Sequence, residues 1–220
     1  PTYAEINELL RTGQADVGFI CGGAFVEGER EGYLELLVVP EINGLTTYQA
    51  LIIVPADSPY RRFEDLRGRR FAFTDPLSNS GRLYVQYRLA QMGETPESFF
   101  QESIYTYSHD NSIRAVAQGI VDGATVDSLV FDALVRSEPD LGARLRVIER
   151  SRPFGIPPVV VHPNLDPALK AAVRQALLTM HQDPQGRQAL AVLHVDRFVL
   201  SDPAAYAEIR QMAAQLRGWK

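Results

Sequence analysis

The stretch YAEINELLRTGQADVGFICGGA at residues 3–24 and the stretch SIRAVAQGIVDGATVDSLV at residues 112–130 share one pattern. In each stretch a helical pattern ends at a glycine, Gly13 or Gly119, an aspartate follows three residues later, and a short apolar run comes next. Glycine readily adopts the left-handed conformation that closes a helix. We therefore predict that one helix-turn-strand unit is used twice in this chain.

Each of the two predicted strands ends in small or polar residues. The first delivers Gly22-Gly23-Ala24 and the second delivers Asp127-Ser128 at its carboxyl end. In open α/β sheets, ligands gather beyond the carboxyl ends of strands. Two such ends that face each other make a cleft, so the repeat predicts a two-lobed α/β binding protein with its site between the lobes.

Composition limits the classes of protein to consider. The chain has 220 residues, of which 45% are hydrophobic and 22% are charged, enough for one large or two small α/β lobes. Its formal net charge of -5 argues against a nucleic-acid or anionic-membrane partner, because both need a basic field. No run approaches the roughly 20 apolar residues that cross a bilayer. The single cysteine, Cys21, excludes an internal disulfide, and we interpret it as a small buried residue.

Two clusters of helix-breaking and strand-breaking residues divide the chain. Residues 55–59 and residues 152–158 are rich in proline and bracket a middle block of the sequence. We therefore assign residues 1–55 and 154–220 to one lobe and residues 56–153 to the other, with the two crossings as a hinge. Hydrophobic patterning predicts strands at 15–21, 34–42, 48–54, 70–74, 103–107, 144–150 and 159–162, and helices or helical turns at 2–11, 24–29, 63–66, 80–92, 98–101, 127–138 and beyond 167.

The loop between the predicted strand 70–74 and the predicted helix 80–92 has the composition of an oxyanion site. Ser78 and Ser80 offer hydroxyl donors, Asn79 offers an amide, and the first helical turn offers unpaired N–H groups. Serine at such a position also caps helices, which is the alternative interpretation. The sequence therefore predicts either an anion cradle or an ordinary helix cap at this loop.

Four further residues are candidates for the site. Tyr3 and Tyr48 stand at the edges of predicted elements, where a phenol packs its ring and still offers a hydroxyl, although core or rim packing is the alternative. His109 and Asp127 follow predicted strands, and either residue can instead cap the helix after it. A neutral histidine donates one hydrogen bond and a charged one donates two, so we expect affinity to depend on pH. The carboxylate of Asp127 would accept a hydrogen bond from a protonated oxyanion or an amine, which selects such ligands over fully ionised groups.

Several segments together resemble the phosphate/phosphite/phosphonate-binding proteins of ABC transporters, a family with the type 2 periplasmic binding fold. They are residues 3–24, YQALIIVPADSP at 48–59, DPLSNSG at 75–81, YSHD at 107–110 and VDGATVD at 121–127. The resemblance implies a two-lobed fold with a ligand cleft between the lobes, a small phosphorus-containing anion as ligand, an ABC transporter permease as partner, and a periplasmic or extracytoplasmic location.

The resemblance also implies roles for the candidate residues. It implies that the loop with Ser78, Asn79 and Ser80 holds the oxygens of the anion, that His109 lies near the ligand, and that Tyr3 and Tyr48 reach into the cleft from the first lobe. Family members normally begin with a strand, a helix and a second strand before the segment that matches residue 3. We therefore expect that the N-terminal part of the first lobe is missing from this sequence.

Catalysis is the weaker interpretation. His109, Asp110 and Ser112 lie too close in sequence to face one another as a triad, and the chain has no Gly-x-Ser-x-Gly elbow. It also lacks HExxH, CxxC and Walker motifs, so we expect no enzyme activity, no metal and no cofactor. The alternative function that stays open is an extracytoplasmic sensor domain of a signalling protein such as a histidine kinase, with a fused signalling module as its partner.

Overall fold

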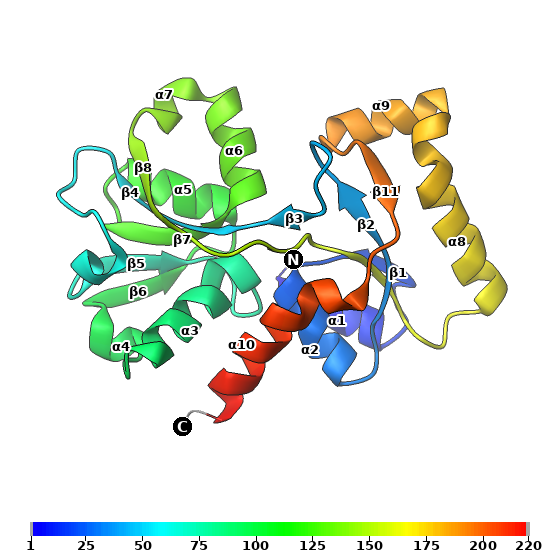
Figure 1. Cartoon of the computed structure of the whole chain (residues 1–220), viewed down its shortest axis with the longest axis horizontal. Coiled ribbons are helices and arrows are strands. Elements are labelled where there is room, and N and C mark those ends of the chain that lie inside the picture. Colours follow the sequence, from blue (N-terminus) through cyan, green and yellow to red (C-terminus); the bar gives the residue numbers. More distant parts are fainter. Residues whose placement is uncertain (1, 219–220) are drawn as a thin grey trace. The chain divides into compact units, whose positions relative to one another are not determined.

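The structure is a computed structural model that describes residues 2–218. It divides the chain into two compact units. Unit 1 runs to Thr47 and returns from Phe154 to Ile209, and unit 2 comprises Tyr48–Pro153 together with the residues from Arg210 onward. Each unit has its own sheet and its own helices (Figure 1).

Unit 1 is built on a four-stranded sheet in the order β1-β10-β2-β11, in which every pairing is antiparallel. Its core packs helix residues such as Leu190 against strand residues such as Val38 and Val161. The strands are β1 (Val17–Phe19), β2 (Glu35–Glu41), β10 (Val159–Val161) and β11 (Arg197–Val199). The α-helices that lie wholly in unit 1 are α1 (Tyr3–Arg11), α2 (Gly22–Arg30), α8 (Pro167–Thr179) and α9 (Pro184–Val192).

Unit 2 is built on a five-stranded sheet in the order β6-β5-β7-β4-β8. The strands are β4 (Ala50–Pro55), β5 (Arg70–Phe73), β6 (Glu102–Tyr105), β7 (Gly123–Asp127) and β8 (Leu145–Arg150). The helices are η1 (Phe63–Leu66), η2 (Asn79–Leu83), α3 (Tyr84–Gln91), α4 (Pro96–Phe99), α5 (His109–Ala117), α6 (Ser128–Ser137) and α7 (Pro139–Gly142).

Four further short elements lie near the crossings of the chain or within unit 1. They are β3 (Thr47–Tyr48), β9 (Phe154–Gly155), η3 (Met180–Gln182) and η4 (Pro203–Tyr206). Helix α10 (Ala207–Gly218) begins in unit 1, and its residues from Arg210 are grouped with unit 2. The short strand β11 and the helix α7 were not predicted from the sequence.

The central strands β4, β5 and β7 of the unit 2 sheet are buried on both faces, whereas most residues of the edge strand β6 are exposed. On one face, residues of α5 and α6 such as Val116 and Phe131 pack against Ala72 and Val126 of the strands. Elsewhere in the unit, Phe71 of β5 stacks on Phe100 with ring centroids 4.3 Å apart. Because these central strands are covered on both sides, continuous apolar runs are the expected sequence pattern for them.

The predicted boundary between the lobes at residue 55 differs from the boundary in the structure. The sequence analysis assigned residues 48–55 to the first lobe, together with the strand at 34–42. In the structure, β4 pairs with β7 on one side and β8 on the other, so it is an interior strand of unit 2, whereas β2 belongs to unit 1. An apolar strand has the same hydrophobic pattern in either sheet. The pattern predicts that the strand is buried, but it does not show which neighbouring strands pair with it.

The repeated helix-turn-strand unit is confirmed in both places. Gly13 follows α1 with φ of 69°, and Gly119 follows α5 with φ of 71°, so each glycine has the left-handed conformation that closes its helix. Thr2 and Glu5 also form the reciprocal capping pair at the start of α1. The sequence therefore predicted the local geometry of both copies correctly.

The two aspartates of the repeat have different surroundings. Asp122 follows Gly119, and its Oδ2 accepts hydrogen bonds from the backbone N–H and the Nε–H of Arg70, at 2.9 and 3.3 Å, where β5 begins. Asp16, at the same place in the first copy, is exposed and forms no hydrogen bond or ion pair with the residues that the structure describes. Only the second aspartate ties its turn to a neighbouring strand.

Because Asp122 forms these hydrogen bonds and Asp16 does not, alanine variants of the two aspartates can be compared directly. We expect Asp122→Ala to lower the free energy of unfolding by about 1–2 kcal/mol, because a backbone N–H and a guanidinium lose their carboxylate acceptor. Asp16→Ala should change it by less than about 0.5 kcal/mol. Urea denaturation of both variants measures the difference, and equal effects would contradict the assigned role of Asp122.

Candidate functional site

Three helices of unit 2 begin at one edge of its sheet. Strand β5 is parallel to both β6 and β7, so the carboxyl ends of these three strands meet at the same edge (Figure 1). Residues 74–78 lead from β5 into η2 and α3, residues 106–108 lead from β6 into α5, and α6 follows β7 directly. The first turn of a helix presents N–H groups and the positive end of its dipole, so this edge favours an anion.

Ser78 is the N-cap of the η2–α3 helix. Its Oγ accepts a hydrogen bond from the backbone N–H of Gly81 at 2.9 Å, as the capping interpretation predicted. The cap uses a lone pair of the hydroxyl oxygen and leaves the hydroxyl hydrogen available to a ligand. The two interpretations of Ser78 are therefore compatible with each other.

Ser80 is the most informative residue of this loop. The side chain is fully buried, and its Oγ has no hydrogen-bond partner among the residues that the structure describes. A buried hydroxyl without a partner costs about 1–3 kcal/mol, so native proteins rarely keep one without a reason. Its backbone carbonyl, by contrast, is held by the hydroxyl of Thr125 on β7.

Gly81 allows the helix start to approach the end of β5. A Cβ atom at this position would lie 2.4 Å from the Cβ of Thr74 and 2.8 Å from the Oγ of Ser78. Residues 79–83 also form a short π-helical turn, a feature that is frequent at functional sites. The glycine therefore permits a packing that brings Ser78 and Ser80 against the strand.

Asn79 and Tyr48 are brought together within unit 2. The Nδ2 of Asn79 donates a hydrogen bond to the phenol oxygen of Tyr48 at 2.9 Å, and both side chains are buried. Tyr48 is the last residue of β3, two residues before β4 begins, and Asn79 lies at the start of η2. The sequence analysis had placed these residues in different lobes, and the structure places them in the same one.

His109 stands at the start of α5 with its ring held in one tautomer. Its Nδ1 accepts a hydrogen bond from the backbone N–H of Asp127 at 3.1 Å and lies 3.2 Å from the Oγ1 of Thr74. Because Nδ1 is an acceptor, the hydrogen of the neutral ring is on Nε2. Burial lowers the pKa of His109 from 6.5 to about 4. His109 is thus a neutral, single donor near pH 7, and its charge changes only under more acidic conditions.

Asp127 caps α6, as the alternative interpretation predicted. Its Oδ1 accepts hydrogen bonds from the backbone N–H groups of Leu129 and Val130 at 2.7 and 3.4 Å. Burial raises the pKa of Asp127 from 3.8 to about 7, although the two backbone hydrogen bonds oppose this shift. The carboxyl group can therefore either donate or accept a proton near neutral pH, while Oδ2 makes no hydrogen bond to the described residues.

Two threonines of this site were not predicted from the sequence. Thr74 directly follows β5 and lies beside the ring of His109, and the hydroxyl of Thr125 on β7 donates to the backbone carbonyl of Ser80. Both side chains are buried, and each has apolar neighbours before it in the sequence. The sequence does contain one indication of the role of Thr125, because it is a polar residue between the apolar residues Ala124 and Val126.

Tyr3 belongs to unit 1, where it occupies the first turn of α1 and is partly exposed. The other six predicted residues all belong to unit 2. The predicted role of Tyr3 therefore stays a prediction.

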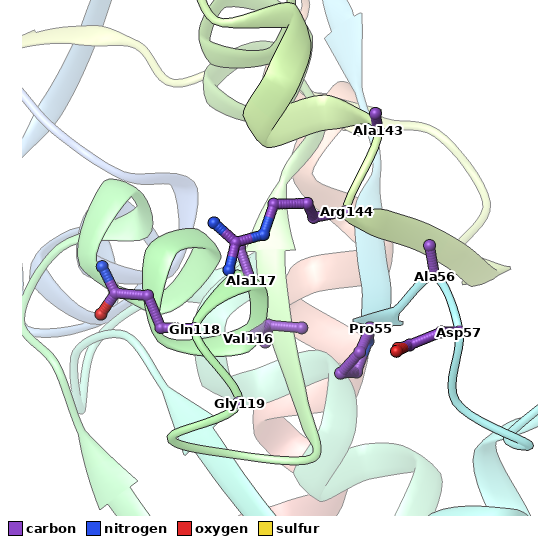
Figure 2. A pocket seen from close by; sticks show the side chains of 9 residues that line it. All are labelled: Pro55, Ala56, Asp57, Val116, Ala117, Gln118, Gly119, Ala143 and Arg144. Carbon is purple, nitrogen blue, oxygen red and sulfur yellow. The ribbon is translucent and has the colours of Figure 1, made fainter.

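A separate cavity of about 410 Å³ lies at the opposite edge of the unit 2 sheet (Figure 2). It is lined by Pro55–Asp57 at the end of β4, by Val116–Gly119 at the end of α5, and by Ala143 and Arg144 before β8. None of the predicted site residues lines it. Among residues 2–218, no cluster of three or more His, Cys, Asp or Glu side chains is placed to hold a metal ion.

The pKa values of His109 and Asp127 are shifted in opposite directions, so each residue should make stability depend on pH. A variant of each residue measures its contribution separately. The lowered pKa of His109 contributes stability that is present above pH 6.5 and is lost as pH falls toward 4. The raised pKa of Asp127 contributes stability that is present below pH 3.8 and is lost as pH rises through about 7. The two contributions oppose each other in the same window.

We therefore expect the free energy of unfolding of Asp127→Asn, relative to the unchanged protein, to rise between pH 4 and 6.5, by up to about 3 kcal/mol. His109→Asn, whose amide oxygen can replace Nδ1 as acceptor, should show the opposite slope up to pH 7. Denaturant titrations at four pH values measure both. If the two variants have the same slope, the assigned shifts are wrong.

Comparison with known proteins extends these observations. A family model described as "ABC transporter, phosphonate, periplasmic substrate-binding protein" matches residues 1–206. The phosphonates-binding periplasmic protein of Escherichia coli is 27% identical over 218 residues, which covers 97% of this chain and 64% of the relative. The phosphate-import protein PhnD of Mycolicibacterium smegmatis is 28% identical over 144 residues, or 60% of this chain and 45% of the relative. The chain thus spans less than two thirds of the length of these curated relatives.

A solved structure gives the same result for the fold. The binding protein component of an ABC phosphonate transporter from Pseudomonas aeruginosa superposes with a TM-score of 0.89 at 26% identity, covering 98% of this chain and 73% of that one. The mixed α/β architecture of periplasmic binding proteins, predicted from the sequence, is confirmed. None of the helices in the described part of the chain is long and apolar enough to span a membrane. With a match across residues 1–206, the chain belongs to the family of phosphonate periplasmic substrate-binding proteins of ABC transporters.

Proposed function

We propose that this protein binds a phosphorus oxyanion, a phosphonate or phosphate, at the edge of the unit 2 sheet where β5, β6 and β7 end. The observation that carries the proposal is the buried hydroxyl of Ser80, which lacks a partner at the start of a helix. An anionic oxygen at this position would satisfy that hydroxyl and would also benefit from the helix dipole.

The surrounding groups complete a set of donors. Ser78 still has its hydroxyl hydrogen, and the neutral ring of His109 has its hydrogen on Nε2. Oxygens of the ligand would accept from these groups and from N–H groups of the first helical turn. The site thus supplies neutral donors and dipoles, which hold an anion without a cationic side chain.

Asp127 supplies the discriminating group in this proposal. A carboxyl group with a pKa of about 7 shares a proton with a phosphorus oxyanion, which itself titrates near neutrality. A fully ionised anion such as sulfate offers no proton and would meet repulsion whenever Asp127 is ionised. The proposal therefore favours ligands that carry a P–OH group or an amine.

The biological context follows from the family. We propose that the protein acts in the periplasm or elsewhere outside the cytoplasm and passes its ligand to an ABC transporter permease. The sensor-domain alternative has less support, because the matching family model describes a transport component. Closure of two lobes on the ligand, with a contribution from Tyr3, stays a prediction from the sequence.

Variants of the two serines test the site. Ser80→Ala should weaken binding of methylphosphonate by about tenfold to a hundredfold, because a hydrogen bond to a charged group is worth about 1.5–3 kcal/mol. It should leave stability unchanged or slightly higher, because a buried hydroxyl without a partner is removed. Ser78→Ala should weaken binding and also lower stability by about 1 kcal/mol, because it removes the helix cap.

Isothermal titration calorimetry and urea denaturation measure the two effects. Ser103→Ala, on the exposed face of β6, is the matched control and should change neither quantity. Unchanged binding by Ser80→Ala would count against the proposed site, whatever the behaviour of Ser78→Ala.

A ligand screen tests the chemical class. Phosphate, phosphite, methylphosphonate and 2-aminoethylphosphonate should be compared with sulfate in a thermal-shift assay at pH 7, since a ligand that binds only the folded state raises the melting temperature. We expect at least one phosphorus compound to raise the melting temperature and sulfate to have no effect. Asp127→Asn should reduce the preference over sulfate. A response to sulfate equal to that of every phosphorus compound would contradict the role of Asp127.

A further inference from the structure

Tyr107 has a backbone conformation that is unfavourable for its side chain. It follows β6 with φ of 57°, in the left-handed region that glycine occupies without cost and a bulky residue does not. Its side chain is 60% exposed. A bulky aromatic residue held in this conformation at the surface points to a functional role for the ring.

The backbone accounts for the turn but not for the choice of tyrosine. Thr106 N–H donates to the carbonyl of Phe73 at 3.0 Å, and Tyr107 N–H donates to the carbonyl of Thr74 at 2.7 Å, so both residues continue along the end of β5. The chain then turns sharply to place Ser108 as the N-cap of α5. Glycine would make this turn with less strain, so the turn itself gives no reason for an aromatic ring.

Packing does not explain the ring either. The phenol of Tyr107 forms no side-chain hydrogen bond with any described residue, and its ring contact is with Tyr105, at a centroid distance of 6.2 Å and a tilt of 37°. Tyr105 in turn lies 5.7 Å from the buried ring of Phe73. Tyr105 and Tyr107 together form an exposed aromatic surface, which contacts the core through the ring of Phe73.

This aromatic surface lies at the edge of the sheet that contains the candidate site. Thr74, whose carbonyl holds the backbone of Tyr107, also places its hydroxyl 3.2 Å from the Nδ1 of His109. Tyr107 precedes His109 by two residues, so the aromatic surface and one donor of the candidate site belong to the same short segment.

We propose that Tyr107 determines ligand specificity by contacting the organic substituent of a phosphonate whose oxygens are held at the candidate site. The inference rests on the proposed function and names its substrate class: phosphonates with an apolar or aromatic substituent, in preference to inorganic phosphate. Phosphate has only oxygens around phosphorus, so it would gain nothing from an exposed aromatic ring. A substituent that packs on the ring gains both apolar burial and stacking.

Two variants of Tyr107 and one control test the proposal. Tyr107→Gly removes the ring and relieves the backbone strain, and Tyr107→Phe keeps the ring without the hydroxyl. His194→Gly is the matched control, because His194 is also exposed, has φ of 54°, and lies in unit 1. Affinities for phenylphosphonate, methylphosphonate and inorganic phosphate are measured by calorimetry, and melting temperatures by thermal denaturation.

We expect both glycine variants to raise the melting temperature by about 2–4 °C. Only Tyr107→Gly should bind phenylphosphonate more weakly, by about tenfold. Its affinity for phosphate should stay within about twofold, and Tyr107→Phe should bind phenylphosphonate like the unchanged protein.

Equal phenylphosphonate affinity in Tyr107→Gly and the unchanged protein would overturn the specificity role while leaving the proposed function in place. Equal losses for phenylphosphonate and phosphate would also overturn it, since the ring would then serve the site as a whole. If the unchanged protein binds none of the three ligands, the proposed function fails and this inference fails with it.

Discussion

The parallel pairing of β5 with both β6 and β7 is the constraint on which the candidate site depends. Parallel strands end at the same edge of a sheet, so the helices that follow them also begin there. Ser78, His109 and Asp127 come from segments far apart in the sequence, and each is the N-cap or first residue of one of these helices. Polar side chains therefore lie together at this edge of the sheet, and none of the predicted site residues is a lysine or an arginine.

The chemistry of this edge is governed by burial. His109 and Asp127 are both almost inaccessible to water, and burial shifts their pKa values toward the neutral form of each group. The backbone N–H of Asp127 also fixes the tautomer of His109, so the two residues are connected structurally as well as by their environment. If the proposed function holds, neutral donors and one shared proton would discriminate between anions by their protonation rather than by their total charge.

The same edge contains local features that lower stability. The hydroxyl of Ser80 is buried without a partner, and Tyr107 has a left-handed backbone conformation. Gly81, by contrast, avoids strain, because no other residue could pack so closely against Thr74. Unfavourable features that concentrate around one group of helix starts are typical of binding sites, where the ligand completes interactions that the protein alone leaves unmade.

Local signals in the sequence were sufficient for much of this protein. The glycines that close α1 and α5, the cap formed by Thr2 and Glu5, and the helix that begins near Ser80 all follow from interactions between residues close in the chain. Only the tertiary structure decided that β4 belongs to unit 2, that Asn79 contacts Tyr48, and that Asp127 donates its backbone N–H to His109. Strand partners and buried pKa values depend on residues distant in sequence, and local patterns contain no information about which distant surface covers a given residue.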